Sequence, residues 1–456
     1  MTAEPFRLGA AEAARAIAAF EISSEDLTTS CLRRIAEREA AVQAWAHLDP
    51  ERALAQAREA DARRARGEPL GPLHGVPVGV KDIIDTADMP TENGTVLHEG
   101  RRPDRDASIV SFLREAGAVI LGKTVTTELA VYAPGKTRNP HDPEHTPGGS
   151  SSGSAAAVAD FHVPLALGTQ TNGSVIRPAS FCGVVGYKPT HGLVSRAGVL
   201  RQSRLLDHVG LFARSVEDAA LLAEALLRFD PQDPDMRPVS RAGFRATATA
   251  EAPLPPRFAF VRTPMWEQTT EETREGFAEL ADALGDRAEA VELPPAFAEV
   301  VERHRTIMEA DLAASFADDY RRGADRLSGT LRGMIERGRE VRAVDYMEAA
   351  ERRPAFVAAA AEILHCYDAI LTPATPGAAP RGLESTGSPV FCTIWTYCGL
   401  PAVSLPLLQG GSGLPIGVQL VGRPGDDARL LRTARWLETR VLRPDRRSRK
   451  AGRTAR

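Results

Sequence analysis

Two short loops rich in glycine and serine contain the side chains best suited to chemistry. Residues 147–154 read Pro-Gly-Gly-Ser-Ser-Ser-Gly-Ser, and residues 168–174 read Gly-Thr-Gln-Thr-Asn-Gly-Ser. Glycine allows backbone conformations that other residues avoid and lets a ligand approach closely. Backbone N–H groups gathered around a serine can stabilise the negative charge that develops on a carbonyl oxygen. The loops therefore indicate a nucleophilic serine, although a flexible surface loop can have the same composition.

A nucleophilic serine needs a base to take its proton. The ten histidines leave a Ser-His-Asp triad open by count, but we expect His74, His162 and His191 to be structural. Lys81 follows the apolar run 76–80, which predicts a buried strand with the lysine at its end. Burial disfavours the charged amine, and the pKa must fall from about 10.4 to about 8 for a base near neutral pH. The alternative is an exposed lysine at a strand end.

Several longer motifs resemble those of the amidase signature family. They are residues 75–82 (Gly-Val-Pro-Val-Gly-Val-Lys-Asp), 122–124 (Gly-Lys-Thr), 148–151 (Gly-Gly-Ser-Ser), 173–174 (Gly-Ser), 182–190 (Cys-Gly-Val-Val-Gly-Tyr-Lys-Pro-Thr), 371–373 (Leu-Thr-Pro), 399–402 (Gly-Leu-Pro-Ala) and 413–419 (Gly-Leu-Pro-Ile-Gly-Val-Gln). They occur in the family's order over residues 60–440. The resemblance implies an α/β fold of the amidase-signature type, with a large mixed twisted sheet covered by helices on both faces.

The resemblance also assigns roles to individual residues. It implies a catalytic triad of Lys81, Ser150 at a cis peptide bond, and the nucleophile Ser174. Ser151 and Ser152 are the alternatives for the middle serine. The implied oxyanion hole consists of the N–H groups of Thr171, Asn172, Gly173 and Ser174. The implied supporting residues are Gly149, Ser151, Gln170 and Arg177. No cofactor or metal is expected.

The implied mechanism is a proton relay that ends in an acyl-enzyme. Neutral Lys81 takes a proton from Ser150, which takes one from Ser174 as Ser174 attacks the amide carbonyl. Ser150 then returns a proton to the leaving nitrogen, because an amine departs poorly as an anion. Water hydrolyses the acyl-enzyme by the reverse relay.

The loop that presents Ser174 departs from the family pattern. Gln170 replaces an aspartate, Asn172 replaces a glycine, and Arg177 lies one position later than the usual arginine, with Ile176 in its place. Because the family's aspartate and arginine lie close to the serines, the changes resemble one coordinated exchange. We hypothesise that Gln170 makes neutral hydrogen bonds in place of an ion pair. A solvent-facing Gln170 would refute this.

The elements that position these residues are predicted from hydrophobic periodicity. We divide the chain into a helical segment (1–65), one α/β domain (66–440) with a long proline-rich connection (229–256), and a disordered basic tail (441–456). Strands are predicted at 76–80, 118–121, 164–167, 258–261, 369–371, 402–405 and 416–421. Helices are predicted at 11–20, 27–36, 51–66, 107–116, 155–159, 270–284, 299–322, 343–366 and 428–438. This alternation is typical of an α/β sheet with helices on both faces.

Composition excludes several classes of protein. The chain has 456 residues and a net charge of −4, so it lacks the basic excess of a nucleic-acid-binding protein. Five scattered cysteines indicate reduced thiols, and no stretch approaches the roughly 18 apolar residues that cross a bilayer. The N-terminus has no signal-peptide pattern. We therefore expect a cytoplasmic monomer or homodimer that binds a small-molecule amide or carbamate, with no nucleic-acid or membrane partner.

Three alternatives and the substrate stay open. Residues 117–124 match the nucleotide-binding pattern GxxxxGK[ST], but their four intervening residues are themselves strand-like. The altered loop could mark an inactive binding protein. The third alternative is the amidase subunit of a tRNA-dependent amidotransferase.

We expect the substrate pocket to draw on residues 126–134, 299–350 and 391–397, with Phe391, Trp395 and Tyr397 either lining it or packing in the core. If some of them line the pocket, aryl or other apolar amides fit best, and carbamates are chemically adjacent because the same attack applies to them. The chain resembles stand-alone bacterial amidases, aryl acylamidases and urethanases, which stay open as alternatives.

Overall fold

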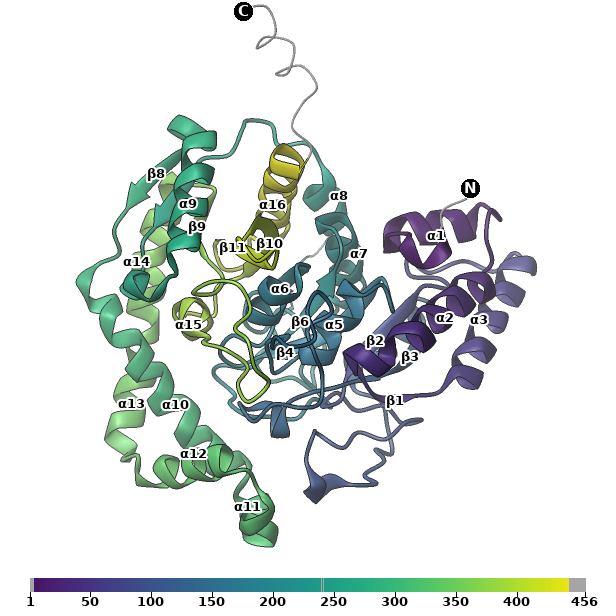
Figure 1. Cartoon of the computed structure of the whole chain (residues 1–456), viewed down its shortest axis with the longest axis horizontal. Helices are drawn as coiled ribbons and strands as arrows, with labels where there is room; N and C mark the ends of the chain where they lie inside the picture. The colour runs from purple at the N-terminus through teal and green to yellow at the C-terminus, as the bar shows by residue number, and fades with distance from the viewer. Residues whose placement is uncertain (1–3, 239, 241, 443–456) are drawn as a thin grey trace, which may run out of the picture.

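The fold centres on one mixed sheet of eleven strands (Figure 1). The computed structural model describes residues 4–238, 240 and 242–442. The strands are β1 (Trp45–Leu48), β2 (Pro77–Lys81), β3 (Val119–Thr124), β4 (Leu165–Gln170), β5 (Val185–Lys188), β6 (His208–Ala213), β7 (Phe258–Val261), β8 (Ala288–Val291), β9 (Ala369–Pro373), β10 (Ala402–Gln409) and β11 (Pro415–Val421). Their order is β1-β3-β2-β4-β6-β5-β10-β11-β9-β7-β8. β2 is parallel to both of its neighbours, whereas β4 and β6 are antiparallel. The predicted mixed α/β sheet is confirmed.

Sixteen α-helices surround the sheet in the described part of the chain. They are α1 (Ala10–Ala18), α2 (Ser24–Val42), α3 (Pro50–Ala65), α4 (Ser108–Glu115), α5 (Ser152–Ala159), α6 (Ile176–Cys182), α7 (Val216–Leu226), α8 (Phe244–Thr249), α9 (Glu271–Leu284), α10 (Val300–Ser315), α11 (Ala317–Gly323), α12 (Gly329–Glu340), α13 (Ala343–Glu351), α14 (Arg353–Cys366), α15 (Val390–Tyr397) and α16 (Asp427–Leu442). Short 3₁₀ turns lie between some of them.

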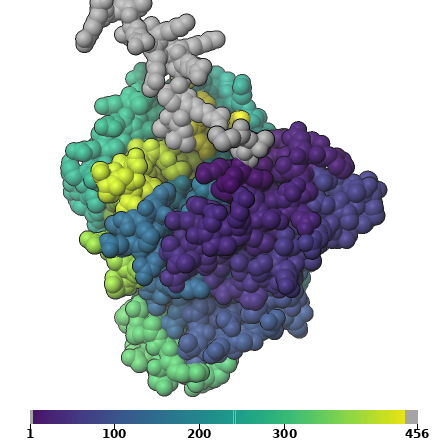
Figure 2. All heavy atoms as spheres, turned by 45° about the vertical axis from the view of Figure 1, so that its right-hand side comes forward, coloured from purple at the N-terminus to yellow at the C-terminus, as the bar shows by residue number. Residues whose placement is uncertain are grey.

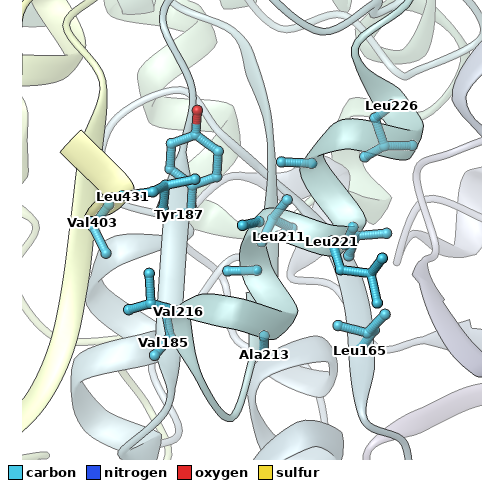
Figure 3. Close-up of a cluster of buried hydrophobic side chains, with 14 of the residues drawn as sticks. Leu165, Val185, Tyr187, Leu211, Ala213, Val216, Leu221, Leu226, Val403 and Leu431 are labelled. Atoms are coloured by element: carbon cyan, nitrogen blue, oxygen red, sulfur yellow. The ribbon is translucent and has the colours of Figure 1, made fainter. Parts of the chain in front are cut away.

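The two faces of the sheet bury alternate residues of the same strands. In β4, Leu165 and Leu167 belong to the apolar cluster that includes α7 and α16. Ala166, between them, belongs to the cluster on the other face, which includes α5. Figure 3 shows the first cluster, where Leu165, Leu211 and Tyr187 from three strands meet Leu221 of α7. This alternation with a period of two is what places helices on both faces.

The N-terminal helical segment also contributes a strand that the sequence analysis missed. β1 pairs antiparallel with β3, with Trp45 opposite Thr124, and forms one edge of the sheet. In the space-filling view, the described N-terminal residues, drawn in purple, form one surface with the blue residues that follow them (Figure 2). A four-residue strand between two long helices has too few positions for its alternation to be recognised.

Helices α10–α14 lie between β8 and β9 in the sequence, and α10 to α13 form a layer at the lower left of the molecule in Figure 1. The helix predicted at 299–322 is two helices, and the helix predicted at 343–366 breaks at Arg352. Pro354 lies in the first turn of α14, where a proline is tolerated, whereas inside one long helix it would remove a hydrogen bond. α12 was not predicted. α10 packs against α12, α13 and α15.

Two other predicted segments differ in detail. The connection at 229–256 contains the short helix α8, which packs against α7 and α16 through the buried Phe244 and Ala248. The helix predicted at 428–438 is α16, which continues to Leu442. Residues 443–456 of the predicted basic tail lie outside the described residues.

Candidate active site

Neighbouring parallel strands bring the candidate lysine to the glycine- and serine-rich loops. β2 ends at Lys81, and its neighbour β4 ends at Gln170, just before the loop 171–174. The register pairs Val80 with Leu167, so Lys81 lies beside the last residues of β4. Because parallel strands end at the same edge of a sheet, both loops meet the lysine at one place.

Lys81 is completely buried and bonded to two hydroxyl groups. Its Nζ lies 2.7 Å from Ser150 Oγ and 2.8 Å from Thr169 Oγ1. Burial lowers the pKa of Lys81 well below its ordinary value, the Asp207 carboxylate opposes this shift, and the Arg177 guanidinium adds to it. The amine is therefore held towards its neutral form, whose lone pair can accept the Ser150 proton across the same 2.7 Å contact. Thr169 was not singled out from the sequence.

Arg177 connects the two serine loops. The peptide bond between Gly149 and Ser150 is cis, as the resemblance implied. The Arg177 guanidinium donates to the Gly149 carbonyl from Nε at 3.2 Å and from Nη2 at 2.7 Å, and Nη1 donates to the Gly387 carbonyl. The backbone N–H of Arg177 donates to the Gly173 carbonyl at 2.9 Å. One residue therefore fixes the backbone that precedes both Ser150 and Ser174.

The loop 171–174 offers free hydrogen-bond donors around a free hydroxyl. Ser174 is 8% exposed, and its hydroxyl has no hydrogen-bond partner among the described residues, Ser150 included. No described residue accepts a hydrogen bond from the backbone N–H groups of residues 171–174. Buried backbone donors are normally paired, so a row of unpaired ones beside a serine suits a developing oxyanion.

Gln170 makes neutral hydrogen bonds, as hypothesised. Its side chain is 1% exposed, and Oε1 accepts from the N–H groups of Val175 at 2.8 Å and Ile176 at 3.0 Å. Its Nε2 donates to Thr396 Oγ1 at 2.8 Å. Gln170 thus holds the start of α6, directly after the nucleophile loop, without an ion pair. Arg177 does not bond to it in the described structure and satisfies backbone carbonyls instead.

Asn172 anchors the nucleophile loop on both sides. Its Nδ2 donates to the Tyr132 hydroxyl at 2.8 Å, and its Oδ1 accepts from Thr393 Oγ1 at 2.7 Å. Its backbone carbonyl accepts from Thr396 Oγ1 at 2.5 Å. A glycine here could make only the last of these bonds, so the departure from the family pattern adds two contacts that hold the loop.

Asp207 and His304 hold Thr171, and the sequence analysis missed both. Thr171 Oγ1 donates to Asp207 Oδ1 at 2.6 Å, and His304 Nε2 donates to the Thr171 carbonyl at 2.9 Å. Burial raises the pKa of Asp207 to about 6 and lowers the pKa of His304 to about 4. Near neutral pH the carboxylate is therefore mostly ionised and the imidazole neutral. His304 comes from α10, and nothing in its local sequence relates it to the loop.

An open pocket of about 480 Å³ adjoins Asn172. All three predicted segments contribute to it, through Tyr132, through helices α10 and α12, and through Thr393. Of the two alternatives for the aromatic side chains of residues 391–397, the structure shows packing in the core. Phe391, Trp395 and Tyr397 of α15 are at most 1% exposed and belong to the core, because α15 turns these side chains towards the sheet and the helical layer.

The sequence model of the amidase family matches residues 26–431, which is most of the chain. The chain belongs to the amidase family. This family member is 37% identical to a putative amidase, AmiD, of Mycobacterium tuberculosis, over 93% of this chain and 92% of AmiD. It is 34% identical to a glutamyl-tRNA(Gln) amidotransferase subunit of Chloroflexus aggregans, over 94% of this chain and 96% of that one.

The enzyme also resembles solved structures over its whole length. The peptide amidase of Stenotrophomonas maltophilia superposes with a TM-score of 0.84 at 30% identity, covering 96% of this chain and 97% of that one. Together with the family match, these similarities establish the chain as an enzyme that hydrolyses carbon–nitrogen bonds.

We also searched the described residues for a metal site, a nucleotide-binding loop and a membrane-spanning helix. They contain no group of three or more His, Cys, Asp or Glu side chains that could hold a metal ion. Residues 119–124 of the nucleotide-binding pattern form the buried strand β3, and Lys123 donates to Thr91 and lies 3.4 Å from Asp82. That strand leaves no loop of exposed amides for a phosphate. No helix among the described residues is both long and apolar enough to cross a membrane.

Proposed function

We propose that the enzyme is a serine amidohydrolase that cleaves linear amides through an acyl-enzyme on Ser174. One observation carries the proposal above the others. Lys81 is a fully buried amine whose described hydrogen bonds go only to two hydroxyl groups, one of them Ser150. A lysine that serves structure alone would normally meet a carboxylate or backbone carbonyls when buried. A buried amine that forms no ion pair among the described residues and contacts a serine hydroxyl is suited to take the serine proton.

The proposed acylation uses two connected proton transfers. Ser174 Oγ attacks the substrate carbonyl and gives its proton to Ser150 Oγ, while the Ser150 proton passes to Lys81 Nζ. The carbonyl oxygen becomes an oxyanion that meets the unpaired N–H groups of residues 171–174. The C–N bond then breaks as Ser150 protonates the leaving nitrogen and Lys81 returns a proton to Ser150.

Deacylation repeats the relay with water in place of Ser174. Water gives one proton to Ser150 as it attacks the ester, and Ser174 regains a proton when it leaves. All groups return to their starting protonation states, and the products are a carboxylic acid and an amine. In a carbamate the same attack breaks the C–N bond and releases the amine, and hydrolysis of the alkoxycarbonyl-enzyme gives an alkyl hydrogen carbonate that breaks down to the alcohol and CO₂. We propose aryl amides and carbamates as the first substrates to examine, since the pocket beside Asn172 has many apolar side chains.

The second candidate is the amidase subunit of a tRNA-dependent amidotransferase. Relatives named as such subunits are 34–37% identical to this chain. That subunit would release ammonia from glutamine for a partner protein. The hydrogen bonds of Gln170 and Asn172, which replace the family pattern in the nucleophile loop, favour a hydrolase that acts alone. Glutamine as the best substrate of the purified chain would reverse this preference.

A panel of chromogenic anilides, aliphatic amides, esters and carbamates tests the proposal directly. The wild type should hydrolyse members of the panel, and a fluorophosphonate probe should label Ser174. Ser174→Ala should abolish both. Ser151→Ala is the matched control for the middle serine, because Ser151 bonds to the backbone of Thr169 rather than to Lys81. Equal hydrolysis by Ser174→Ala and the wild type would refute the mechanism.

A further inference from the structure

The pocket beside the nucleophile loop contains a pair of opposite charges, Glu309 of α10 and Arg337 of α12. Arg337 Nε lies 3.0 Å and 3.1 Å from the two oxygens of Glu309, and Nη2 lies 2.5 Å from Oε1. Glu309 is only 5% exposed, whereas the Arg337 side chain is 59% exposed and pairs with Glu309 from the mouth of the pocket. This fork geometry occupies the carboxylate and neutralises the one acidic side chain among the described residues of the pocket wall.

The other ionisable groups that face the pocket leave its interior without a net charge. Burial lowers the pKa of His304 to about 4 and raises the pKa of Tyr132, so both are neutral near pH 7. Arg305 lies at the rim, where its side chain is 60% exposed and bonded to Glu302 at 2.5 Å. The apolar part of the wall consists of Val301, Met308, Met334, Pro389 and Val390.

The pocket is close to the position where the reaction takes place. Asn172, two residues before Ser174, belongs to its wall. Pro389, another wall residue, packs against Gly173 so closely that a Cβ on Gly173 would lie 2.8 Å from the proline Cβ. A substrate whose carbonyl reaches the N–H groups of this loop would therefore place one of its two substituents in the pocket.

We infer that this pocket selects a neutral, largely apolar substituent and that the Glu309–Arg337 pair sets the selection. A charged substituent would lose its hydration in the pocket and find no free counter-charge. Removing either partner exposes a single charge, which would then favour substrates of the opposite sign. The inference extends the proposed hydrolase function to its substrate class.

Two matched series of anilides test the inference. In one series the acyl chain ends in a methyl, a carboxylate or an ammonium group, and in the other the same groups are on the aniline ring. Wild type should prefer the neutral member of the series whose variable half enters the pocket. Glu309→Gln should raise the relative kcat/KM for the carboxylate member about tenfold, because it frees Arg337. Arg337→Gln should do the same for the ammonium member.

Two further variants control for loss of folding and for general charge effects. The double variant Glu309→Gln with Arg337→Gln has no unpaired charge and should return to the neutral preference. Glu299→Gln removes an exposed carboxylate from the start of α10, where it pairs with Arg303 outside the pocket, and should keep the wild-type preference. An unchanged order of preference in both series, for variants that still hydrolyse the neutral anilides, would overturn the inference.

A binding measurement separates this inference from the proposed chemistry. The anilides of both series can be tested by thermal shift as ligands of Ser174→Ala, alone and combined with Glu309→Gln, which needs no turnover. The same reversal of preference in Glu309→Gln supports the inference even for an enzyme that hydrolyses none of the anilides. Failure of fluorophosphonate labelling, by contrast, overturns only the proposed nucleophile.

Discussion

The guanidinium of Arg177 holds the carbonyl of Gly149, the residue joined to Ser150 by the cis peptide bond, with Nη2 2.7 Å from the oxygen. Through its backbone N–H, the same arginine bonds to Gly173, the residue before Ser174. The displaced arginine therefore acts on both serine loops at once. Its charge is not paired with a carboxylate among the described residues, since its side-chain hydrogen bonds go to carbonyl groups.

Arg177→Met should impair catalysis as well as stability. Leaving the buried Gly149 carbonyl without its donors should cost about 1–3 kcal/mol of folding free energy. The partly buried Gly387 carbonyl also loses a donor. The two serine loops would also lose their shared anchor, so kcat should fall. Arg214→Met is a matched control, because Arg214 also donates to backbone carbonyls but lies far from the serines. Thermal unfolding and kcat measure the two effects, and an equal change in kcat for both variants would contradict the role of Arg177.

The buried amine of Lys81 predicts a particular pH profile. Burial lowers its pKa, so the amine stays neutral at pH values where an exposed lysine is charged. The rate should therefore decline only as the pH falls through this lowered pKa, and kcat/KM should be on its plateau well below pH 10. A rate that keeps rising up to pH 10 would show that Lys81 is not the base.

Lys81→Met should be inactive yet more stable than the wild type near neutral pH. The unfolded chain binds a proton at Lys81 below about pH 10.4, whereas the folded chain binds it only below the lowered pKa. Folding is therefore opposed at every pH below about 10.4, by an amount that grows as the pH falls to the lowered pKa. A methionine removes this penalty, with an expected gain of about 1 kcal/mol. The advantage should shrink as the pH rises towards 10.4. Denaturant unfolding of both proteins at pH 7 and at pH 10 measures the difference in their free energies of unfolding at each pH.

Asp207→Asn should move the acidic limb of the rate profile to lower pH. The Asp207 carboxylate raises the pKa of Lys81, opposing the effect of burial. Removing this negative charge disfavours the protonated lysine, so its pKa falls further. Asparagine keeps an oxygen that can accept from Thr171. Asp235→Asn removes a half-buried carboxylate that pairs with Arg196 and Arg204, and it should leave the profile in place. An acidic limb that moves to higher pH would refute the electrostatic role of Asp207.

Some parts of the site were predictable from local sequence, and others were not. The run of apolar residues before Lys81 predicts a buried strand, and the structure places the lysine at the end of β2. The unusual Gln170 could be recognised because the family motif gave a residue to compare it with. His304 and Asp207 could not, because their contacts with Thr171 span 133 and 36 residues of sequence. Periodicity reports which face of an element is buried but not which distant loop it meets.

The same limit explains the missed elements. β1 is four residues long and depends on pairing with β3, so its own sequence carries little signal. α15 was considered only as an aromatic segment, and its helical geometry decides that Trp395 packs in the core while Thr393 reaches the pocket. The orientation of each side chain in this segment thus follows from tertiary packing, and the segment reaches the pocket beside Asn172 through Thr393.

The single hydroxyl of Thr396 links the two departures in the nucleophile loop. It accepts from Gln170 Nε2 at 2.8 Å and donates to the Asn172 carbonyl at 2.5 Å. Thr396→Val keeps the shape of the side chain but leaves the buried Gln170 amide without its acceptor. We expect a loss of about 1–3 kcal/mol in folding free energy. Because Asn172 contributes to the row of free N–H groups, kcat should also fall about tenfold, which corresponds to roughly 1.4 kcal/mol in the barrier.

Thr375→Val separates this effect from simple destabilisation. Thr375 is buried, and its hydroxyl also takes part in two hydrogen bonds, with Ser180 and with the Gly377 carbonyl, but it does not contact residues 170–174. It should lose stability to a similar extent while keeping kcat close to the wild-type value. If the two valine variants lower kcat equally, the hydrogen bond from Thr396 to Asn172 does not shape the oxyanion site. If only Thr396→Val lowers kcat, the nucleophile loop depends on the Thr396 hydroxyl for its catalytic geometry. Gln170 then supports the Asn172 carbonyl through that hydroxyl.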